Sequence, residues 1–394
     1  MKLDVLLTDG SYKHTYAMLR ALKEKGLKVG VVSYSRFALT NFSRFVDKKF
    51  IIAKILGNNS EAEFIGYKNE MLKILRENEI DVVLPVGNIS VNFFNRYTAE
   101  FSELTKFPFV ESSVLELAQN KNKTFEIAEQ LNIPCPKTFY PESYKSIATI
   151  AETINFPCVI KKTKYFESGV KYCNSKEDLL LFYSEYSKRF PDNLDLPIIQ
   201  EFIEGNGFGF FALFKDGECK AYFMHERLHE LPVTGGVSTF ARSIHDEKLK
   251  LTGLKILERL KWNGVAMVEF KKDIRDGQYK LIEINPKFWG SLELSYRAGI
   301  NFPYLTYLMC LDKELPRDNP YTENFYFRWI MPDDFTWQLQ VDSKRRAEFK
   351  KIKKEVTISK NIYPDDPMIN FYNFVLTFYR LIKTKRYPHG LVKK

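Results

Sequence analysis

Two apolar stretches in the second half of the chain each contain a glutamate, and a strong turn signal lies between them. Glu269 interrupts the apolar run 265–271, and Glu283 interrupts the run 278–284. The dipeptide Asp276-Gly277 between the runs favours a tight hairpin turn, because its residue types tolerate positive φ. The pattern predicts an antiparallel hairpin that brings Glu269 near Glu283, within about one residue of register.

This hairpin carries the chemistry that the sequence indicates most strongly. Glu283 and Asn285 lie on one face of their strand, because side chains alternate along a strand. Two carboxylates inside a mostly apolar sheet repel each other unless a cation compensates them. Mg²⁺ prefers oxygen ligands and shares its coordination shell with phosphates, so we predict a metal site formed by Glu269, Glu283 and Asn285. The alternative is a pair of solvated strand positions.

The first part of the chain alternates between strand and helix patterns. Apolar runs at 5–7, 29–32 and 81–85 read as buried strands, and residues 14–25 and 64–78 have helical spacing. Alternation of this kind predicts an open parallel sheet. The turn 9–11 lacks the glycine spacing of a dinucleotide fingerprint, so it indicates no such cofactor.

The middle of the chain contains two lysines and one pair of polar residues that are candidates for ligand binding. Lys121 lies in a helical stretch at 112–132, and Lys161 ends an apolar strand at 156–161, where its ammonium can meet a phosphate. Gln200 and Glu201 lie in the apolar strand 196–203 and supply acceptors suited to the edge of an adenine. Further on, a Lys-Asp-Gly turn at 215–217 joins the strands 208–214 and 220–224 into another hairpin, and residues 246–260 read as a helix.

The net charge limits the kinds of partner that we expect, and the cysteine content limits the cellular location. The net charge of +10 favours anionic partners, but we find no basic stripe or module typical of nucleic-acid binding. The five cysteines are widely spaced and suit neither a disulfide framework nor a zinc site, so we expect a reducing, cytoplasmic location. The sequence contains no run of about eighteen apolar residues that could cross a membrane.

Five motifs occur in order along the chain: Asn-Lys121 before a helix, FPCVIKK, IIQEFIEG, VEF and EINPKFWGS. Taken together, they resemble the ATP-grasp superfamily, which includes D-alanine–D-alanine ligase, biotin carboxylase and carbamoyl phosphate synthetase. The resemblance covers roughly residues 1–310 and implies an α/β fold with an α+β C-terminal half. It implies a Rossmann-like domain at 1–111 and an ATP-grasp domain at 112–310, with a lid lobe at about 134–200 and a metal lobe at about 201–310. A basic, aromatic extension at 311–394 remains.

The resemblance also implies roles for individual residues. Lys121 and Lys161 would bind the phosphates of ATP, and Lys287 a phosphate or an acyl phosphate. The adenine hinge would comprise Gln200, Glu201 and Ile203. The hairpin residues would hold one or two Mg²⁺ ions, with Mn²⁺ as a second candidate metal.

Two positions depart from the superfamily's pattern. Gly207 stands where relatives carry a ribose-binding acid, so Glu204 or Asn206 would serve instead. The lid loop 162–170 contains one glycine, so we expect Lys162 or Lys164 to take over phosphate cover.

The activity implied is ATP-dependent ligation of a small-molecule carboxylate to an amine through an acyl phosphate, with release of ADP. In the polar segment 225–242, Arg227 and Arg242 are the candidates to grip a carboxylate or phosphate, because a guanidinium binds planar oxyanions with two hydrogen bonds. The alternative for this segment is a surface loop with paired charges.

A second class of function stays open at this level. The same fold could bind nucleotide for sensing or phosphorylation without forming an amide bond. In that case the tail, with the aromatic stretch 371–382 flanked by lysines, would dock on a membrane or a partner. The sequence leaves the choice between a monomer and a homodimer open.

Overall fold

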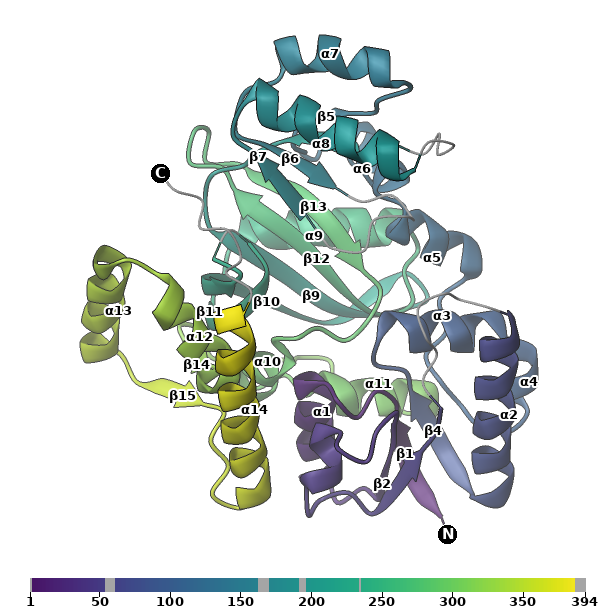
Figure 1. The fold of residues 1–394 in the computed structure, drawn as a ribbon. Helices are drawn as coiled ribbons and strands as arrows, with labels where there is room; N and C mark the ends of the chain where they lie inside the picture. Colours follow the sequence, from purple (N-terminus) through teal and green to yellow (C-terminus); the bar gives the residue numbers. More distant parts are fainter. Residues whose placement is uncertain (1, 54–60, 162–169, 191–195, 234, 387–394) are drawn as a thin grey trace. The chain divides into compact units, whose positions relative to one another are not determined.

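A computed structural model describes residues 2–53, 61–161, 170–190, 196–233 and 235–386 (Figure 1). They form two compact units. The first comprises Met1–Ile127, Gly207–Glu269 and Glu283–Lys394, and the second comprises Ala128–Asn206 and Phe270–Ile282. Both units are assembled from separate stretches of chain.

The N-terminal part of the first unit is the parallel sheet that the alternating pattern predicts. Its strand order is β3-β2-β1-β4, and Val5 of the central strand pairs with Val29 on one side and Val82 on the other. Its elements are β1 (Leu3–Leu7), α1 (Lys13–Lys23), β2 (Val29–Ser33), η1 (Leu39–Phe42), β3 (Lys48–Ile51), α2 (Glu61–Glu77), β4 (Ile80–Leu84), α3 (Asn88–Arg96) and α4 (Thr98–Ser102).

Helices cover both faces of this sheet, with α1 and α2 on opposite sides (Figure 1). Tyr16 and Leu19 of α1 pack with Val5 into one apolar core. Phe64 of α2 and Phe93 of α3 belong to a second core on the other face. The strands are therefore apolar on both faces, as parallel strands buried between helices must be.

A seven-stranded sheet forms the centre of the first unit, in the order β13-β12-β9-β10-β11-β14-β15. The last residues of β12 and the first of β13 belong to the second unit. Its elements and the helices of this region are β9 (Gly207–Lys215), β10 (Glu218–Leu231), β11 (Val237–Ser243), α9 (Glu247–Arg259), β12 (Gly264–Lys272), β13 (Tyr279–Asn285), α10 (Leu292–Ala298) and α11 (Phe302–Cys310).

The C-terminal residues complete this sheet. Strand β14 pairs antiparallel with β11, and β15 pairs parallel with β14. Helix α14 packs on η1 and η2, and Asp366 just before it accepts hydrogen bonds from Ser43 and Tyr16 at 2.5 and 3.1 Å. The C-terminal elements are β14 (Tyr326–Arg328), η2 (Ile330–Asp334), α12 (Phe335–Gln340), α13 (Ser343–Glu355), β15 (Ile358–Lys360) and α14 (Pro367–Arg386). Two further helices, α5 (Ser112–Gln119) and α6 (Lys121–Gln130), follow the parallel sheet, and the last residues of α6 belong to the second unit.

The second unit is a small antiparallel sheet with two helices. The strand order is β5-β8-β6-β7, and Ile147, Leu179 and Ile199 belong to its apolar core. Its elements are β5 (Thr138–Phe139), α7 (Tyr144–Thr153), β6 (Cys158–Lys161), β7 (Val170–Cys173), α8 (Lys176–Arg189) and β8 (Ile198–Glu201).

Both hairpins expected from sequence are confirmed. Gly277 and Gly217 take positive φ at their turns, as does Asp216. The helix expected at 112–132 is instead two helices, because Asn120 between them is extended, with ψ of 107°. None of the helices within the described ranges is long and apolar enough to cross a membrane.

Candidate functional site

Glu269, Glu283 and Asn285 come together at the ends of β12 and β13. The amide of Asn285 donates to Glu269 at 3.1 Å and to Glu283 at 2.8 Å. The three side chains form the cluster that strand alternation and the Asp276-Gly277 turn predict. We refer to Glu269, Glu283 and Asn285 as the carboxylate cluster.

Arg227 of β10 reaches the carboxylate cluster across the intervening strand β9. Its Nη2 lies 2.7 Å from Glu269 Oε2, and its Nη1 donates to Glu230 at 3.1 Å. The path is open because Gly207 of β9 has no side chain. A Cβ there would lie 2.9 Å from Glu230 Oε1 and 3.0 Å from Arg227 Cδ. Gly207 therefore lets a β10 side chain touch a β12 carboxylate.

Burial and the neighbouring opposite charges shift the pKa values of Glu269 and Arg227 in opposite directions. Burial raises the pKa of Glu269 to about 7; Arg227 opposes this shift and Glu283 adds to it. Burial also disfavours the charge of Arg227, but Glu269 and Glu230 outweigh it and raise the pKa of the guanidinium. Its buried Nε donates to no atom of a described residue, so the guanidinium retains unused hydrogen-bonding capacity.

Two lysines supply further positive charge. Lys121, at the start of α6, contacts Glu283 Oε2 at 2.5 Å. Lys287 follows β13 and has no ion pair within 4 Å among the described residues, although Glu283 and Glu269 favour its charged form. Burial nevertheless lowers the pKa of Lys287. A partly buried ammonium of this kind is suited to an anionic ligand.

The donor set of the carboxylate cluster fits a hard cation. The amide of Asn285 lies within hydrogen-bonding distance of both carboxylates, and its side chain presents its oxygen to the same space after rotation by half a turn. No group of three His, Cys, Asp or Glu side chains in the described part of the chain could hold a metal. A metal here would depend on Asn285 and on phosphate oxygens, as Mg²⁺ sites with nucleotides do.

Arg242 does not join the carboxylate cluster. It lies on β11 opposite Glu226, whose carboxylate it contacts at 2.7 Å, and it also donates to Asn324. Glu226 and Arg227 are consecutive on β10, so their side chains point to opposite faces of the sheet. The structure thus separates the two arginines that the sequence placed together, and the segment 225–242 is mostly strand rather than loop.

The candidate nucleotide residues of the second unit lie on β6, β8 and the chain after β8. Lys161 is the last residue of β6, pairs with Ile198 of β8, and has a largely buried side chain. Gln200 is buried and donates to Thr138 at 2.9 Å. Glu201 pairs with Arg275 at 2.7 Å. Neither polar side chain of β8 is thus free of protein partners.

Backbone groups after β8 are held by the β12–β13 turn region. The carbonyl of Ile203 accepts from Lys271 Nζ at 2.9 Å, and the carbonyl of Glu204 accepts from the amide of Ile274 at 3.0 Å. The amide of Lys272 donates to the carbonyl of Asn206. The side chain of Glu204 is exposed. Lys162 and Lys164 lie outside the described residues.

Sequence reasoning missed three residues of these networks. Glu230 accepts a hydrogen bond from the guanidinium of Arg227, and Gly207 leaves space for the Arg227 side chain. Lys271 donates a hydrogen bond to the Ile203 carbonyl. Lys271 could have been predicted from the sequence, because it lies two residues after Glu269 on the same face of the strand. Glu230 carried no such signal, because β10 has irregular register at residues 227–230.

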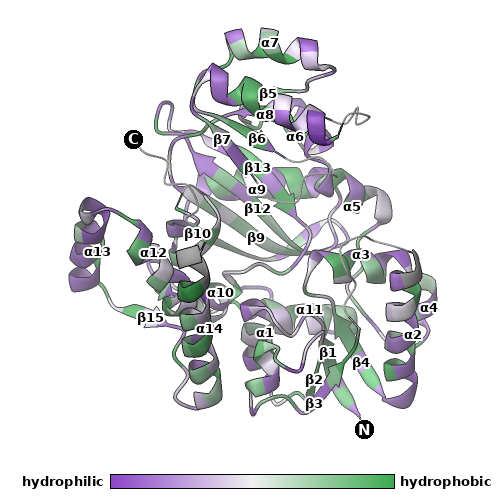
Figure 2. Cartoon of the chain, viewed as in Figure 1, coloured by the Kyte–Doolittle hydropathy of each residue, from purple (hydrophilic) through white to green (hydrophobic). Residues whose placement is uncertain are grey.

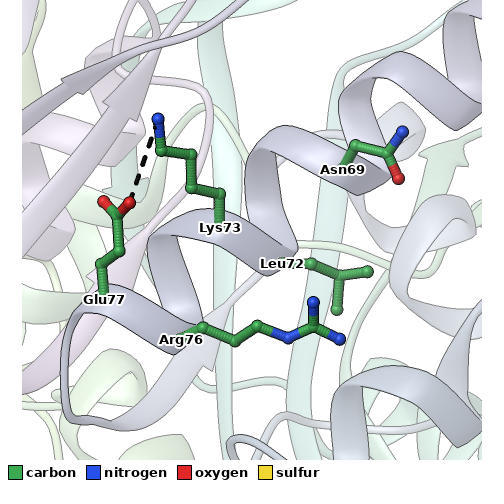
Figure 3. Close-up of a pocket in the computed structure, with 5 residues that line it drawn as sticks. All are labelled: Asn69, Leu72, Lys73, Arg76 and Glu77. Atoms are coloured by element: carbon green, nitrogen blue, oxygen red, sulfur yellow. Dashed lines mark ion pairs between the residues drawn. The ribbon is translucent and has the colours of Figure 1, made fainter.

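A hollow of about 390 Å³ lies on the exposed face of α2 (Figure 3). Its lining is Asn69, Leu72, Lys73, Arg76 and Glu77. The ion pair in it, Lys73 with Glu77, spans 3.9 Å and is largely exposed. Because the lining is a single helix surface, we assign it no chemistry.

Comparison with known proteins agrees with this geometry. Residues 219–331, which include all three residues of the carboxylate cluster, match the model of a family described as ATP-grasp in the biosynthetic pathway with Ter operon. The D-aspartate ligase of Enterococcus faecium is 24% identical over 301 residues, which cover 70% of this chain and 69% of that protein.

Solved structures share the fold at low identity. The biotin carboxylase domain of Hydrogenobacter thermophilus 2-oxoglutarate carboxylase, solved with MgADP and bicarbonate, has a TM-score of 0.63 and 16% identity and covers 83% of this chain and 74% of that one. An L-amino acid ligase from Bacillus licheniformis has a TM-score of 0.59 and 17% identity, with 79% and 75% covered.

The family match and the shared fold agree with the resemblance that the five motifs carry. Residues 219–331 are similar to an ATP-grasp family, and the chain shares the fold of a biotin carboxylase domain.

Proposed function

We propose that this protein is an ADP-forming ligase that uses ATP and Mg²⁺ to convert the carboxylate of an amino acid into an acyl phosphate, which an amine then attacks. The observation that carries the proposal is the carboxylate cluster of Glu269, Glu283 and Asn285 with Arg227 and Lys121 bound to it. Support for an amino acid as the substrate comes from the D-aspartate ligase and L-amino acid ligase among its relatives. Support for Mg²⁺ comes from the MgADP complex of the biotin carboxylase relative.

Glu269, Glu283 and Asn285 would hold the metal, which compensates charge on the phosphate oxygens when bound. Lys121 and Lys287 bind phosphate oxygens, and their charge spreads over the transferred phosphoryl group. A carboxylate oxygen of the substrate attacks the γ-phosphorus, and the bond to the leaving ADP breaks.

In the second half of the reaction the amine nitrogen attacks the acyl carbon. The C–N bond forms, the bond from carbon to the phosphate oxygen breaks, and the nitrogen loses a proton. Arg227 stabilises the oxyanion of the tetrahedral intermediate, because its guanidinium is buried and already held in place by Glu269 and Glu230. In the second unit Lys161 binds a phosphate, and the backbone at Ile203 receives the adenine.

The test is phosphate release from ATP across a panel of D- and L-amino acids, each with and without an amine acceptor. We expect release only when acid and amine are both present, with Mg²⁺ and, as a second arm, with Mn²⁺. Glu283→Gln should lower turnover at least about 100-fold, because it removes a carboxylate from the cluster. The matched control is Glu218→Gln, whose carboxylate is 77% exposed.

Turnover by Glu283→Gln at the wild-type rate would refute the assignment of the carboxylate cluster. ADP formation with the acid alone, together with a phosphorylated acid as the product, would favour the alternative of a phosphorylating protein. Binding of ATP without turnover on any pair would favour a nucleotide sensor.

A further inference from the structure

Helix α14 presents an uncovered apolar stripe. Its buried side, with Ile369 and Thr377, faces the protein and packs on η1 and η2. The opposite side is apolar and about half exposed from residue 368 to residue 382. The stripe comprises Met368 (49%), Phe371 (59%), Phe374 (47%), Val375 (49%), Phe378 (52%), Tyr379 (56%) and Ile382 (63%). These residues recur every three or four positions, so they form one continuous face.

A strongly basic helix lies at the same edge of the seven-stranded sheet. Helix α13 contains seven Lys or Arg residues and two Glu residues, and every one of the basic side chains is exposed. None of the seven has an ion pair with a described residue. They are Lys344, Arg345, Arg346, Lys350, Lys351, Lys353 and Lys354. Figure 2 shows α13 as mainly hydrophilic and α14 as mainly hydrophobic.

More positive charge follows the stripe in the sequence. Residues 383–394 include five Lys or Arg and no acidic residue. An aromatic and aliphatic helix face together with a cluster of cations is the pattern of segments that lie in the interface of an anionic membrane.

We propose that the apolar stripe of α14 and the basic helix α13 dock the protein on an anionic lipid surface. A second copy of the chain could cover the stripe, but it would leave the cations of α13 without a counter-charge. A nucleic acid would compensate the cations, but it would leave the stripe in water. An anionic bilayer surface supplies acyl chains for the stripe and phosphates for α13.

The experiment is cosedimentation of the full chain with lipid vesicles. We expect at least about tenfold more protein on vesicles with one third phosphatidylglycerol than on pure phosphatidylcholine, because both charge and apolar burial contribute. High salt should weaken the binding, because it screens the basic residues. Equal binding to both vesicles, or binding to neither, would overturn the proposal.

Variants separate the two contributions. The double variant Phe371→Ser, Phe378→Ser should lose at least about tenfold in vesicle binding, because two of the stripe's rings are removed. The matched control is Leu181→Ser on α8, where the side chain is 60% exposed. Lys350→Glu, Lys354→Glu should abolish the preference for anionic lipid. Unfolding in urea establishes that each variant is folded.

A dimer in solution offers the competing outcome. If light scattering finds a dimer that the double variant dissociates, and wild-type protein ignores anionic vesicles, the stripe is an interface between copies and the proposal fails. A monomer that binds anionic vesicles supports it.

Discussion

Replacement of Gly207 by alanine tests whether Arg227 reaches the carboxylate cluster through a gap in β9. The new Cβ would lie 2.9 Å from Glu230 Oε1 and 3.0 Å from Arg227 Cδ, whereas ordinary contacts begin near 3.4 Å. Both groups must therefore retreat by roughly 0.4 to 0.5 Å, which moves the guanidinium relative to Glu269. Overpacking of this size costs about 1–3 kcal/mol. The backbone itself is no obstacle, because Gly207 does not have positive φ.

Urea unfolding followed by circular dichroism measures the cost, and ADP release measures the effect on turnover. The matched control is Gly66→Ala in α2, where a Cβ meets nothing within 4 Å. That variant should gain up to about 1 kcal/mol from helix propensity. If Gly207→Ala unfolds at the same urea concentration as wild type and keeps its turnover, the gap has no part in positioning Arg227.

Three further variants test the placement of charges. Arg227→Met should lower kcat at least about 100-fold and Arg242→Met less than about tenfold, because only Arg227 faces the carboxylate cluster; equal losses in steady-state assays would contradict this. Arg275 lowers the pKa of Asp273 from 3.8 to about 2, so this carboxylate stabilises the fold above pH 3.8 and loses that effect as pH falls through 2. Asp273→Asn should therefore cost about 1 kcal/mol at pH 7, allowing for the exposure of Arg275, and less at pH 3 in urea titrations.

The features that local sequence determines were predictable. Apolar periodicity placed α1 and the strands beside it, and the Asp276-Gly277 turn placed β12 against β13. Because side chains alternate along strands, the carboxylate cluster followed from that hairpin alone. Its three members lie on two neighbouring strands joined by a short turn, so no long-range information was needed.

The features that depend on distant pairing were not predictable. β10 continues to Leu231 through a polar segment because partners far along the chain accept its side chains. His229, for example, lies 2.6 Å from Asp334. Whether Arg227 and Arg242 share a face depends on the register of β10 with β11, which includes an irregularity. Strands β14 and β15 have three residues each, too few for a period to be recognised.

The hydrogen bond between Ser43 and Asp366 joins residues 323 positions apart. During synthesis on a ribosome, Ser43 is made early, whereas Asp366 is made only when almost the whole chain has been synthesised. The seven-stranded sheet is also completed late, because β14 and β15 are made after β9 to β13. Contacts of such long separation form slowly. The emerging chain therefore exposes the edge of β11 until β14 has been synthesised, and an unpaired strand edge is prone to aggregation.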